Sequence, residues 1–120
     1  MLIVLWGTSE GSADFKEGLA AVNRGDYATA LREWTQLAEL GHTTAQYNLG
    51  FMYHSGYGVE RDYQIVLKWY TLAANQGYAP AQYVLGLMYN VGEGVARNYR
   101  TALDYTRAYM WWSISASYGY

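Results

Sequence analysis

The chain offers few residues with which to carry out acid–base or metal chemistry. It has two histidines, His42 and His54, and no cysteine. Neither histidine has a second histidine or a carboxylate at the spacing of a metal site, and a chain without thiols forms no disulfide and no Cys–His pair. His54 is expected near the C-terminal end of a helix, where an imidazole interacts favourably with the helix dipole. We therefore predict no catalytic residue, no metal site and no cofactor, and we interpret the protein as a non-enzyme.

Two short glycine-containing segments superficially resemble phosphate-binding loops. They are Gly56-Tyr57-Gly58 and Gly92-Glu93-Gly94. Both follow predicted helices rather than strands, and both lack the additional glycine and the lysine of a nucleotide-binding loop. Because glycine takes positive φ angles without steric cost, we interpret both segments as turns between helices.

Composition narrows the class of protein further. The 120 residues fit one domain, and 52% of them are hydrophobic, which is enough for a core. The 14 tyrosines suit a thin fold in which few side chains are sealed from water on all sides. A formal net charge of −2, without any run of Lys or Arg, argues against nucleic-acid binding. No stretch reaches the roughly 18 apolar residues of a membrane span.

Residues 1–12 are expected to form a leader outside the fold. Leu2–Trp6 is apolar, and Gly11-Ser12-Ala13 fits a signal-peptidase site, but a positively charged start is missing and the apolar run is short. Two alternatives stay open. A remnant of a signal peptide would make the protein periplasmic or secreted, and a loosely packed leader would leave it cytoplasmic.

The rest of the chain is predicted to fold as helices that must position any functional side chain. Apolar residues at helical spacing and an N-cap at Asp26 predict helices over about 13–23 and 27–40, the second ending at Gly41. Further caps and breakers indicate four more: a helix from about 45 to 55 capped by Thr43 or Thr44, one over 63–75 capped by Asp62 and ended by Gly77, one from Pro80 to about 91, and a last helix capped by Asn98.

An internal repeat organises these helices. Ala45–Tyr63 laid over Ala81–Tyr99, 36 residues later, matches at Ala, Gln, Tyr, Leu, Gly, Met, Tyr, Gly, Gly, Val, Arg and Tyr. A period in this range is the signature of a helical solenoid. Gly50 and Gly86 fall in the middle of helices, which indicates close approach of a neighbouring helix. Larger side chains are expected to fill the interhelical seam: Leu49, Met52, Tyr53, Leu85, Met88 and Tyr89.

The flanking repeats depart from this period. In the first, Gly18 precedes Gly50 by 32 residues while Asp26-Tyr27 precedes Asp62-Tyr63 by 36, so the internal turn is four residues shorter. In the third, Asn98-Tyr99 is echoed by Asp104-Tyr105, which indicates a six-residue insertion. If these six residues are left out of the count, Trp111 is predicted to occupy the repeat position of Trp69, and Trp112 that of Tyr70.

The stretch AQYNLGFMYHSGYGVERDYQIVLKWYTLAANQG, residues 45–77, resembles a known family. Its LG-x-x-Y, G-x-G-V, D-Y and W-Y-x-x-A-A elements are similar to the Sel-one-like repeat (SLR), a longer-turn relative of the tetratricopeptide repeat. The resemblance implies an all-α, right-handed superhelix of about three antiparallel helix pairs over residues 13–120, with repeats at about 14–41, 45–77 and 81–119. It also implies an adaptor, of the kind found in bacteria, that assembles protein complexes without catalysis.

Helix geometry supplies a candidate binding surface. Beside the packing stripe of each first helix runs a second stripe that would line the concave, peptide-binding face of such proteins: Phe15 and Leu19 with Val22; Tyr47, Phe51 and His54; Tyr83, Leu87 and Asn90. The alternative for Tyr47 and Tyr83 is that they complete the core between repeats.

The aromatic C-terminus is the second candidate surface, because no charged residue follows Arg107. It comprises Tyr109, Trp111, Trp112 and Tyr118. A solenoid normally ends in a polar cap. This end either folds back as its own cap or meets a second protomer, as in a homodimer, or further repeats. The leading prediction is thus a protein–protein interaction module with an unknown protein or peptide partner, and the alternative is an assembly fragment acting through its last helix.

Overall fold

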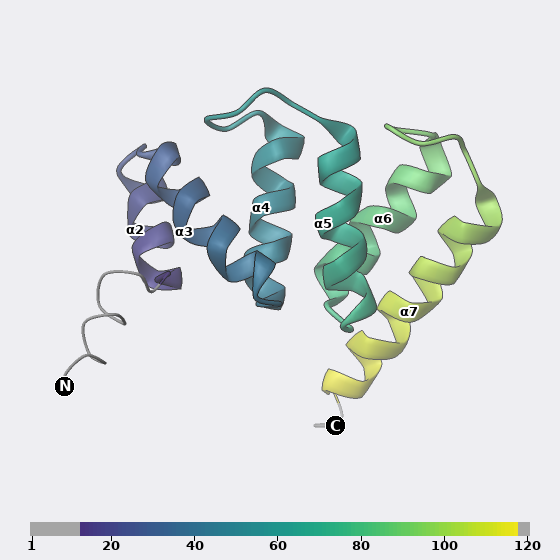
Figure 1. Cartoon of the computed structure of the whole chain (residues 1–120). Helices are drawn as coiled ribbons and strands as arrows, with labels where there is room; N and C mark the ends of the chain where they lie inside the picture. The colour runs from purple at the N-terminus through teal and green to yellow at the C-terminus, as the bar shows by residue number, and fades with distance from the viewer. Residues whose placement is uncertain (1–12, 118–120) are drawn as a thin grey trace.

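The fold is built from helices throughout the part of the chain that the computed structural model describes, residues 13–117. The helices are α2 (Phe15–Asn23), α3 (Tyr27–Glu39), α4 (Thr43–Ser55), α5 (Tyr63–Asn75), α6 (Ala79–Val91) and α7 (Tyr99–Ser117). They pack as sequential pairs, which confirms the predicted all-α arrangement of three helix pairs (Figure 1). The predicted leader, residues 1–12, and Tyr118 lie outside the described residues.

Each helix packs chiefly on its neighbours in sequence, as in a solenoid. Figure 1 shows the pairs next to one another from α2 at the left to α7 at the right, with the long turns of the second and third pairs at one edge. The turn between α2 and α3 spans only residues 24–26, whereas the turn between α4 and α5 spans residues 56–62. The shorter first turn is therefore confirmed.

Short polar side chains begin most of the helices. The carboxylates of Asp26 and Asp62 accept hydrogen bonds from backbone N–H groups of α3 and α5, and Asn98 Oδ1 accepts one from Thr101 N at 3.0 Å, so these three caps are confirmed. The prediction of Thr43 or Thr44 as the cap of α4 is wrong. His42 caps it, with Nδ1 accepting from Ala45 N at 3.1 Å. Stacking of its ring on Phe15 at 5.0 Å holds the imidazole in place for this role.

A glycine lets the two helices of each pair approach closely. A Cβ atom on Gly18 would collide with the indole of Trp34, and one on Gly50 would lie 2.7 Å from the ring of Tyr70. On Gly86 the nearest atom would be Thr106 Oγ1, at 2.9 Å. The facing residues Trp34, Tyr70 and Thr106 follow one another at intervals of 36. Two aromatic seams are thus followed by a third that is filled by a small hydroxyl side chain.

The packing of Thr106 corrects the predicted register of α7. Trp112 was expected to take the position of Tyr70, but Thr106 packs on Gly86 as Tyr70 packs on Gly50. The third turn and its cap Asn98 keep the spacing of the second, so they fix the first turns of α7 in the 36-residue register. The extra residues lengthen the far end instead, and α7 has 19 residues where α5 has 13.

Two clusters of buried side chains form the core, one between the first and second pairs and one between the second and third. Ala45, Leu49 and Met52 of α4 close the first cluster over Trp34. Ala81, Leu85 and Met88 of α6 close the second over Tyr70. Tyr53 and Tyr89 are partly buried against these clusters. The seam residues predicted from the repeat are therefore confirmed. Within residues 13–117, no helix has the length and apolar character needed to cross a membrane.

Candidate functional site

A first groove, the α2–α4 groove, lies where α4 crosses the first pair. It has a volume of about 340 Å³ and is lined by Leu19, Val22, Tyr27, Trp34, Asn48, Phe51, Met52 and Tyr57. Tyr57, from the turn after α4, stacks on Tyr27 at 5.2 Å between ring centroids and lies 5.9 Å from Phe51. These rings give the groove an aromatic rim.

A second groove, the α6–α7 groove, lies between the helices of the last pair. It has a volume of about 520 Å³ and is lined by Tyr83, Gly86, Leu87, Asn90, Tyr99, Ala102, Leu103, Thr106, Tyr109 and Met110. No charged side chain is among them. Thr106 leaves open much of the space that an aromatic ring fills in the other two seams.

The α6–α7 groove corresponds to a surface that is covered elsewhere in the molecule. Seven of its ten lining residues have counterparts, 36 positions earlier, in the second core cluster: Tyr47, Tyr63, Val66, Leu67, Tyr70, Ala73 and Ala74. Those counterparts lie beneath α6, through Ala81, Leu85 and Met88. Among residues 13–117, this core surface of the repeat is not covered by a helix as it is in the preceding pair.

His54 lies in a polar cluster that joins the second and third pairs. Its Nε2 lies 3.1 Å from Glu93 Oε2, and Tyr63 donates its hydroxyl hydrogen to the same oxygen at 3.2 Å. Tyr70 OH lies 3.4 Å from His54 Nδ1. The hydrogen bond from His54 is the main cause that holds the pKa of Glu93 below its ordinary value, despite partial burial. This arrangement docks the α6–α7 turn on α4 and α5.

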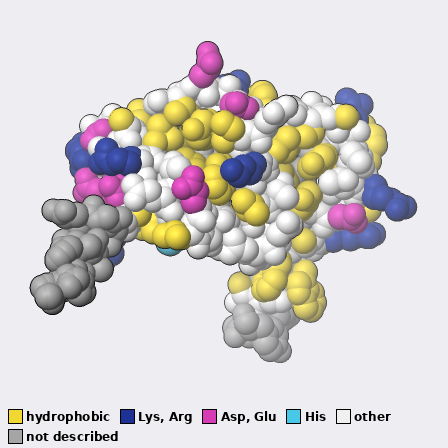
Figure 2. Space-filling model, in the orientation of Figure 1, with side chains coloured by type: hydrophobic (Ala, Val, Ile, Leu, Met, Phe, Trp, Pro, Cys, Tyr) yellow, Lys and Arg dark blue, Asp and Glu magenta, His cyan; other side chains and the backbone are white. Residues whose placement is uncertain are grey.

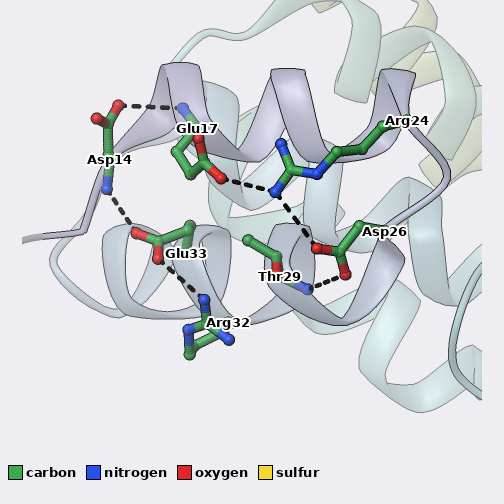
Figure 3. A network of polar contacts seen from close by, with 7 residues as sticks. All are labelled: Asp14, Glu17, Arg24, Asp26, Thr29, Arg32 and Glu33. Atoms are coloured by element: carbon green, nitrogen blue, oxygen red, sulfur yellow. Dashed lines mark hydrogen bonds and ion pairs between the residues drawn. The ribbon is translucent and has the colours of Figure 1, made fainter.

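The outer face of the first pair has a different chemistry. Figure 3 shows Arg24 between two carboxylates, at 2.8 Å from Glu17 and 3.3 Å from Asp26. Asp14 caps α2 and donates its backbone N–H to Glu33, which also faces Arg32. The Thr29 side chain and backbone lower the pKa of Asp26. This end of the described chain is polar, and these charged side chains are paired with one another or with backbone N–H groups.

Comparison with known families decides what the repeat is. A family model described as the Sel1 repeat matches two segments, residues 43–78 and 79–120. They begin at the first residues of α4 and α6, and together they cover more than half of the chain. The chain belongs to the Sel1 repeat family. The resemblance to SLR seen in residues 45–77 is thereby confirmed.

Two solved structures are similar to this SLR chain. A Sel1 repeat protein from Oxalobacter formigenes is 33% identical, with a TM-score of 0.65 over 68% of the chain. A protective antigen of uropathogenic Escherichia coli strains, displaying an SLR fold, is 40% identical, with a TM-score of 0.64 over 67% of the chain. The similar regions make up 23% and 17% of those two proteins. A 34-residue segment is 56% identical to 7% of an uncharacterised protein of Neisseria meningitidis. The likeness thus concerns the repeats, and this chain spans a small part of each relative.

This SLR chain is a Sel1 repeat module, and Sel1 repeats generally serve as protein-interaction scaffolds and are typically not catalytic. Among residues 13–117, no three His, Asp or Glu side chains gather in a way that could hold a metal ion. The two grooves are lined mainly by apolar and aromatic side chains. The arrangement suits contact with another polypeptide.

The stripe residues of the SLR first helices lie in three different settings. Leu19 and Phe51 line the α2–α4 groove, whereas Tyr83, Leu87 and Asn90 line the α6–α7 groove. Phe15 packs between Trp34 and His42. Tyr47 stacks on Tyr70 and Tyr78, and burial, with a smaller effect of Tyr78, raises the pKa of its hydroxyl. Tyr47 thus packs into the core between repeats, while its counterpart Tyr83 is half exposed.

The predicted aromatic surface of α7 is divided in the same way. Tyr109 lines the α6–α7 groove, 5.1 Å from Tyr83. Trp112 rests on Gly77, where a Cβ would lie 2.9 Å from its ring. Trp111 is 65% exposed. Figure 2 shows hydrophobic side chains at this projecting end of the molecule.

Several lining residues of the grooves are not among the site residues predicted from the sequence. Tyr57 is predicted only as part of a turn, and Leu103 and Thr106 are not among the predicted site residues, whereas Met110 lies within the predicted aromatic C-terminus. Thr106 had a usable signal, since the 36-residue period places it where the second repeat has Tyr70. A small residue at a repeat position that is aromatic in the other repeats therefore predicts an open groove, here the α6–α7 groove.

Proposed function

We propose that this SLR chain is a non-catalytic interaction module that binds a protein or peptide across its first helices. The observation that carries the proposal is a row of equivalent, exposed apolar side chains. Leu19, Phe51 and Leu87 occupy the same repeat position on α2, α4 and α6, and they are 43%, 44% and 48% exposed. Single exposed apolar residues are ordinary, but a row repeated with the period of the fold supports a docking face. The predicted residues Tyr83, Asn90 and His54 lie on or beside it.

The affinity of this face would come from apolar and aromatic contacts. Phe51 and Tyr57 form the aromatic rim of the α2–α4 groove, and rigid aromatic anchors of this kind contribute strongly at protein interfaces. His54 is engaged with Glu93, so it would support the face rather than act as a free hydrogen-bonding group. The Figure 2 view shows hydrophobic side chains gathered in patches between the two ends of the molecule.

Recovery of a partner by a Phe51→Asp variant tests the proposal. The immobilised protein is incubated with an extract of its native host, and proteins cross-linked to it are quantified. Phe51→Asp places a charge in the α2–α4 groove and is expected to reduce recovery of the specific partner at least about fivefold. Leu72→Asp is the matched control, because Leu72 is 40% exposed on α5 and lines neither of the two grooves. Equal recovery by the two folded variants would sink the proposal.

A second candidate is assembly through α7, favoured by the apolar side chains exposed along that helix. Tyr99, Leu103, Met110 and Ile114 lie within about one sixth of its circumference and are about half exposed or more. Sedimentation equilibrium separates this candidate from the first. A mass that rises with concentration in the wild type, and not in an Ile114→Glu variant, supports assembly. A monomer at all concentrations excludes self-association as the role of α7.

A further inference from the structure

We infer that the α6–α7 groove is a docking site for one amphipathic helix of a partner protein, with a small residue, a Leu four positions later and a Met seven positions later on its buried face. This goes beyond the first-helix face proposed above. The two surfaces share the α6 residues Tyr83, Leu87 and Asn90, but the α7 wall of the groove is not part of that face. The inference rests on the internal symmetry of the chain. The same face of each of the two preceding pairs is covered by a helix of this pattern.

The covering helices define the chemistry of the occupant. α4 covers the first pair with Ala45, Leu49 and Met52, and α6 covers the second with Ala81, Leu85 and Met88; all six are at most 2% exposed. Positions i, i+4 and i+7 lie on one side of a helix, so each set forms a single apolar stripe. The small first residue lets the covering helix approach closely, while Leu and Met fill the space between helices.

The open groove has the surface that such a stripe covers. Ala102, Leu103 and Met110 stand where the second pair has Val66, Leu67 and Ala74, which lie beneath or against α6. The groove contains no charged side chain, so an apolar stripe would bury no unpaired charge there. Thr106 gives the groove a small side chain where the second pair has the ring of Tyr70.

A second copy of this chain does not offer the required helix at its opposite end. Thirty-two residues before Ala45, Leu49 and Met52 stand Ala13, Glu17 and Ala20. Glu17 is paired with Arg24 at 2.8 Å (Figure 3), and head-to-tail stacking would carry that ion pair into an apolar groove. The described N-terminal end therefore lacks the Leu and Met of the stripe, and a different polypeptide fits the groove better.

The chain itself supplies a probe for the test. A fluorescent peptide of residues 78–91 contains the α6 stripe, and a hydrocarbon bridge replacing Tyr83 and Leu87 would hold it helical. These two side chains lie four positions apart on the side opposite the stripe, and both are exposed in α6. Bridging removes the folding cost that makes an isolated short helix marginal in water. Binding to the full chain is measured by fluorescence anisotropy.

Two adjacent residues of α7 provide matched variants of the protein. Met110 lines the groove and Trp111 does not, and both are more than half exposed, so neither Met110→Glu nor Trp111→Glu buries a charge in the core. We expect saturable binding that Met110→Glu weakens at least about tenfold, while Trp111→Glu changes it less than about twofold. Leu103→Glu, two turns earlier on the same face of α7, should repeat the loss. Circular dichroism verifies that the variants are folded.

Other outcomes overturn the inference. Absence of binding by the bridged peptide excludes a helix of this pattern as occupant, and so does equal binding to the Met110→Glu and Trp111→Glu variants. Binding that survives replacement of Leu85 by Glu in the peptide excludes the stripe as the contact. Self-association abolished by Met110→Glu, with no displacement by the peptide, would assign the groove to a second copy. None of these results bears on Phe51, so the two proposals fail independently.

Discussion

The α4/α5 and α6/α7 pairs are built from similar residues but have different environments. In the second pair, Tyr47 and Tyr70 lie beneath α6, and Tyr70 is 1% exposed. In the third pair, their counterparts Tyr83 and Thr106 face an open groove. One repeat position is core in one pair and surface in the next. In a solenoid the role of a side chain is therefore decided by the following repeat as much as by its own motif.

The seams of the two pairs differ along with their environments. The ring of Tyr70 fills the seam at Gly50, whereas Thr106 occupies the seam at Gly86. The Thr106 hydroxyl donates a hydrogen bond to Ala102 O at 2.8 Å. The covered pair has an aromatic ring in its seam, and the open pair has a small residue whose hydroxyl is hydrogen-bonded within its own helix. This contrast can be tested on stability alone.

The largest difference is expected from alanine at the two seam glycines. Gly50→Ala places a methyl group against the buried ring of Tyr70 and should lower the free energy of unfolding by about 1–3 kcal/mol. Gly86→Ala meets only the exposed Thr106 side chain, which can rotate, so its strain should be offset by the roughly 1 kcal/mol gain in helix propensity. Urea unfolding of both variants measures the difference.

Both glycines lie in the middle of a helix, so the gain in helix propensity is the same at the two sites and cancels in the comparison. Equal losses of stability would mean that Thr106 is as immobile as Tyr70. The contrast between the seams would then be wrong.

Much of the fold was predictable from the sequence because the repeat records local geometry. The 36-residue period places Gly50 and Gly86 at equivalent seams, and Asp26, Asp62 and Asn98 cap helices through contacts within a few residues. Such short-range chemistry is the same in every repeat. The helix ends were accordingly predicted to within about two residues.

What depends on distant neighbours was not predictable from the same pattern. His42 caps α4 because Phe15 of another helix holds its ring, and no local sequence motif predicts that contact. The register of α7 was misjudged because the echo Asp104-Tyr105 resembles Asp62-Tyr63, although the turn before α7 decides which residue reaches Gly86. Tyr47 and Tyr83 share a motif position, and only the presence of α6 over one of them separates core from groove.

A second, smaller difference is expected in alkaline solution. Burial raises the pKa of Tyr70 far above its usual value near 10, with minor effects of Tyr47 and Glu93. A folded-state pKa above the unfolded one means that the stabilisation is complete below about pH 10. Above that pH the stabilisation is lost, because the unfolded chain releases the tyrosine proton first. For one group, the free energy of unfolding falls by at most about 1.4 kcal/mol per pH unit.

Tyr70→Phe should therefore flatten the fall of stability between about pH 10 and 11. Tyr105→Phe in the open pair is the comparison, because burial raises the pKa of Tyr105 as well, but its side chain is only partly buried. We expect the smaller flattening from Tyr105→Phe. The measurement is urea unfolding at several pH values. If the Tyr105 variant shows the larger change, the α6/α7 pair is the better protected one.

The smallest difference concerns two glutamines that occupy one repeat position. Gln46 and Gln82 are each 3% exposed, and each donates from Nε2 to a carbonyl of the preceding helix at 3.1 Å. Gln46 Oε1 also accepts from Gln76 Nε2 at 2.8 Å. The residue 36 positions after Gln76 is Trp112, and Gln82 Oε1 is buried without a hydrogen-bond partner among the described residues.

Replacement by leucine should consequently cost more at Gln46 than at Gln82. Both substitutions lose the bond to the preceding helix, but only Gln46→Leu breaks a second bond, and Gln82→Leu removes a buried acceptor that was unpaired. A neutral hydrogen bond contributes about 1 kcal/mol, and we expect a difference of that size in urea unfolding. Equal costs would show that Gln82 Oε1 finds a donor in solution, such as a bound water. The second and third pairs would then be equally well hydrogen-bonded at this repeat position.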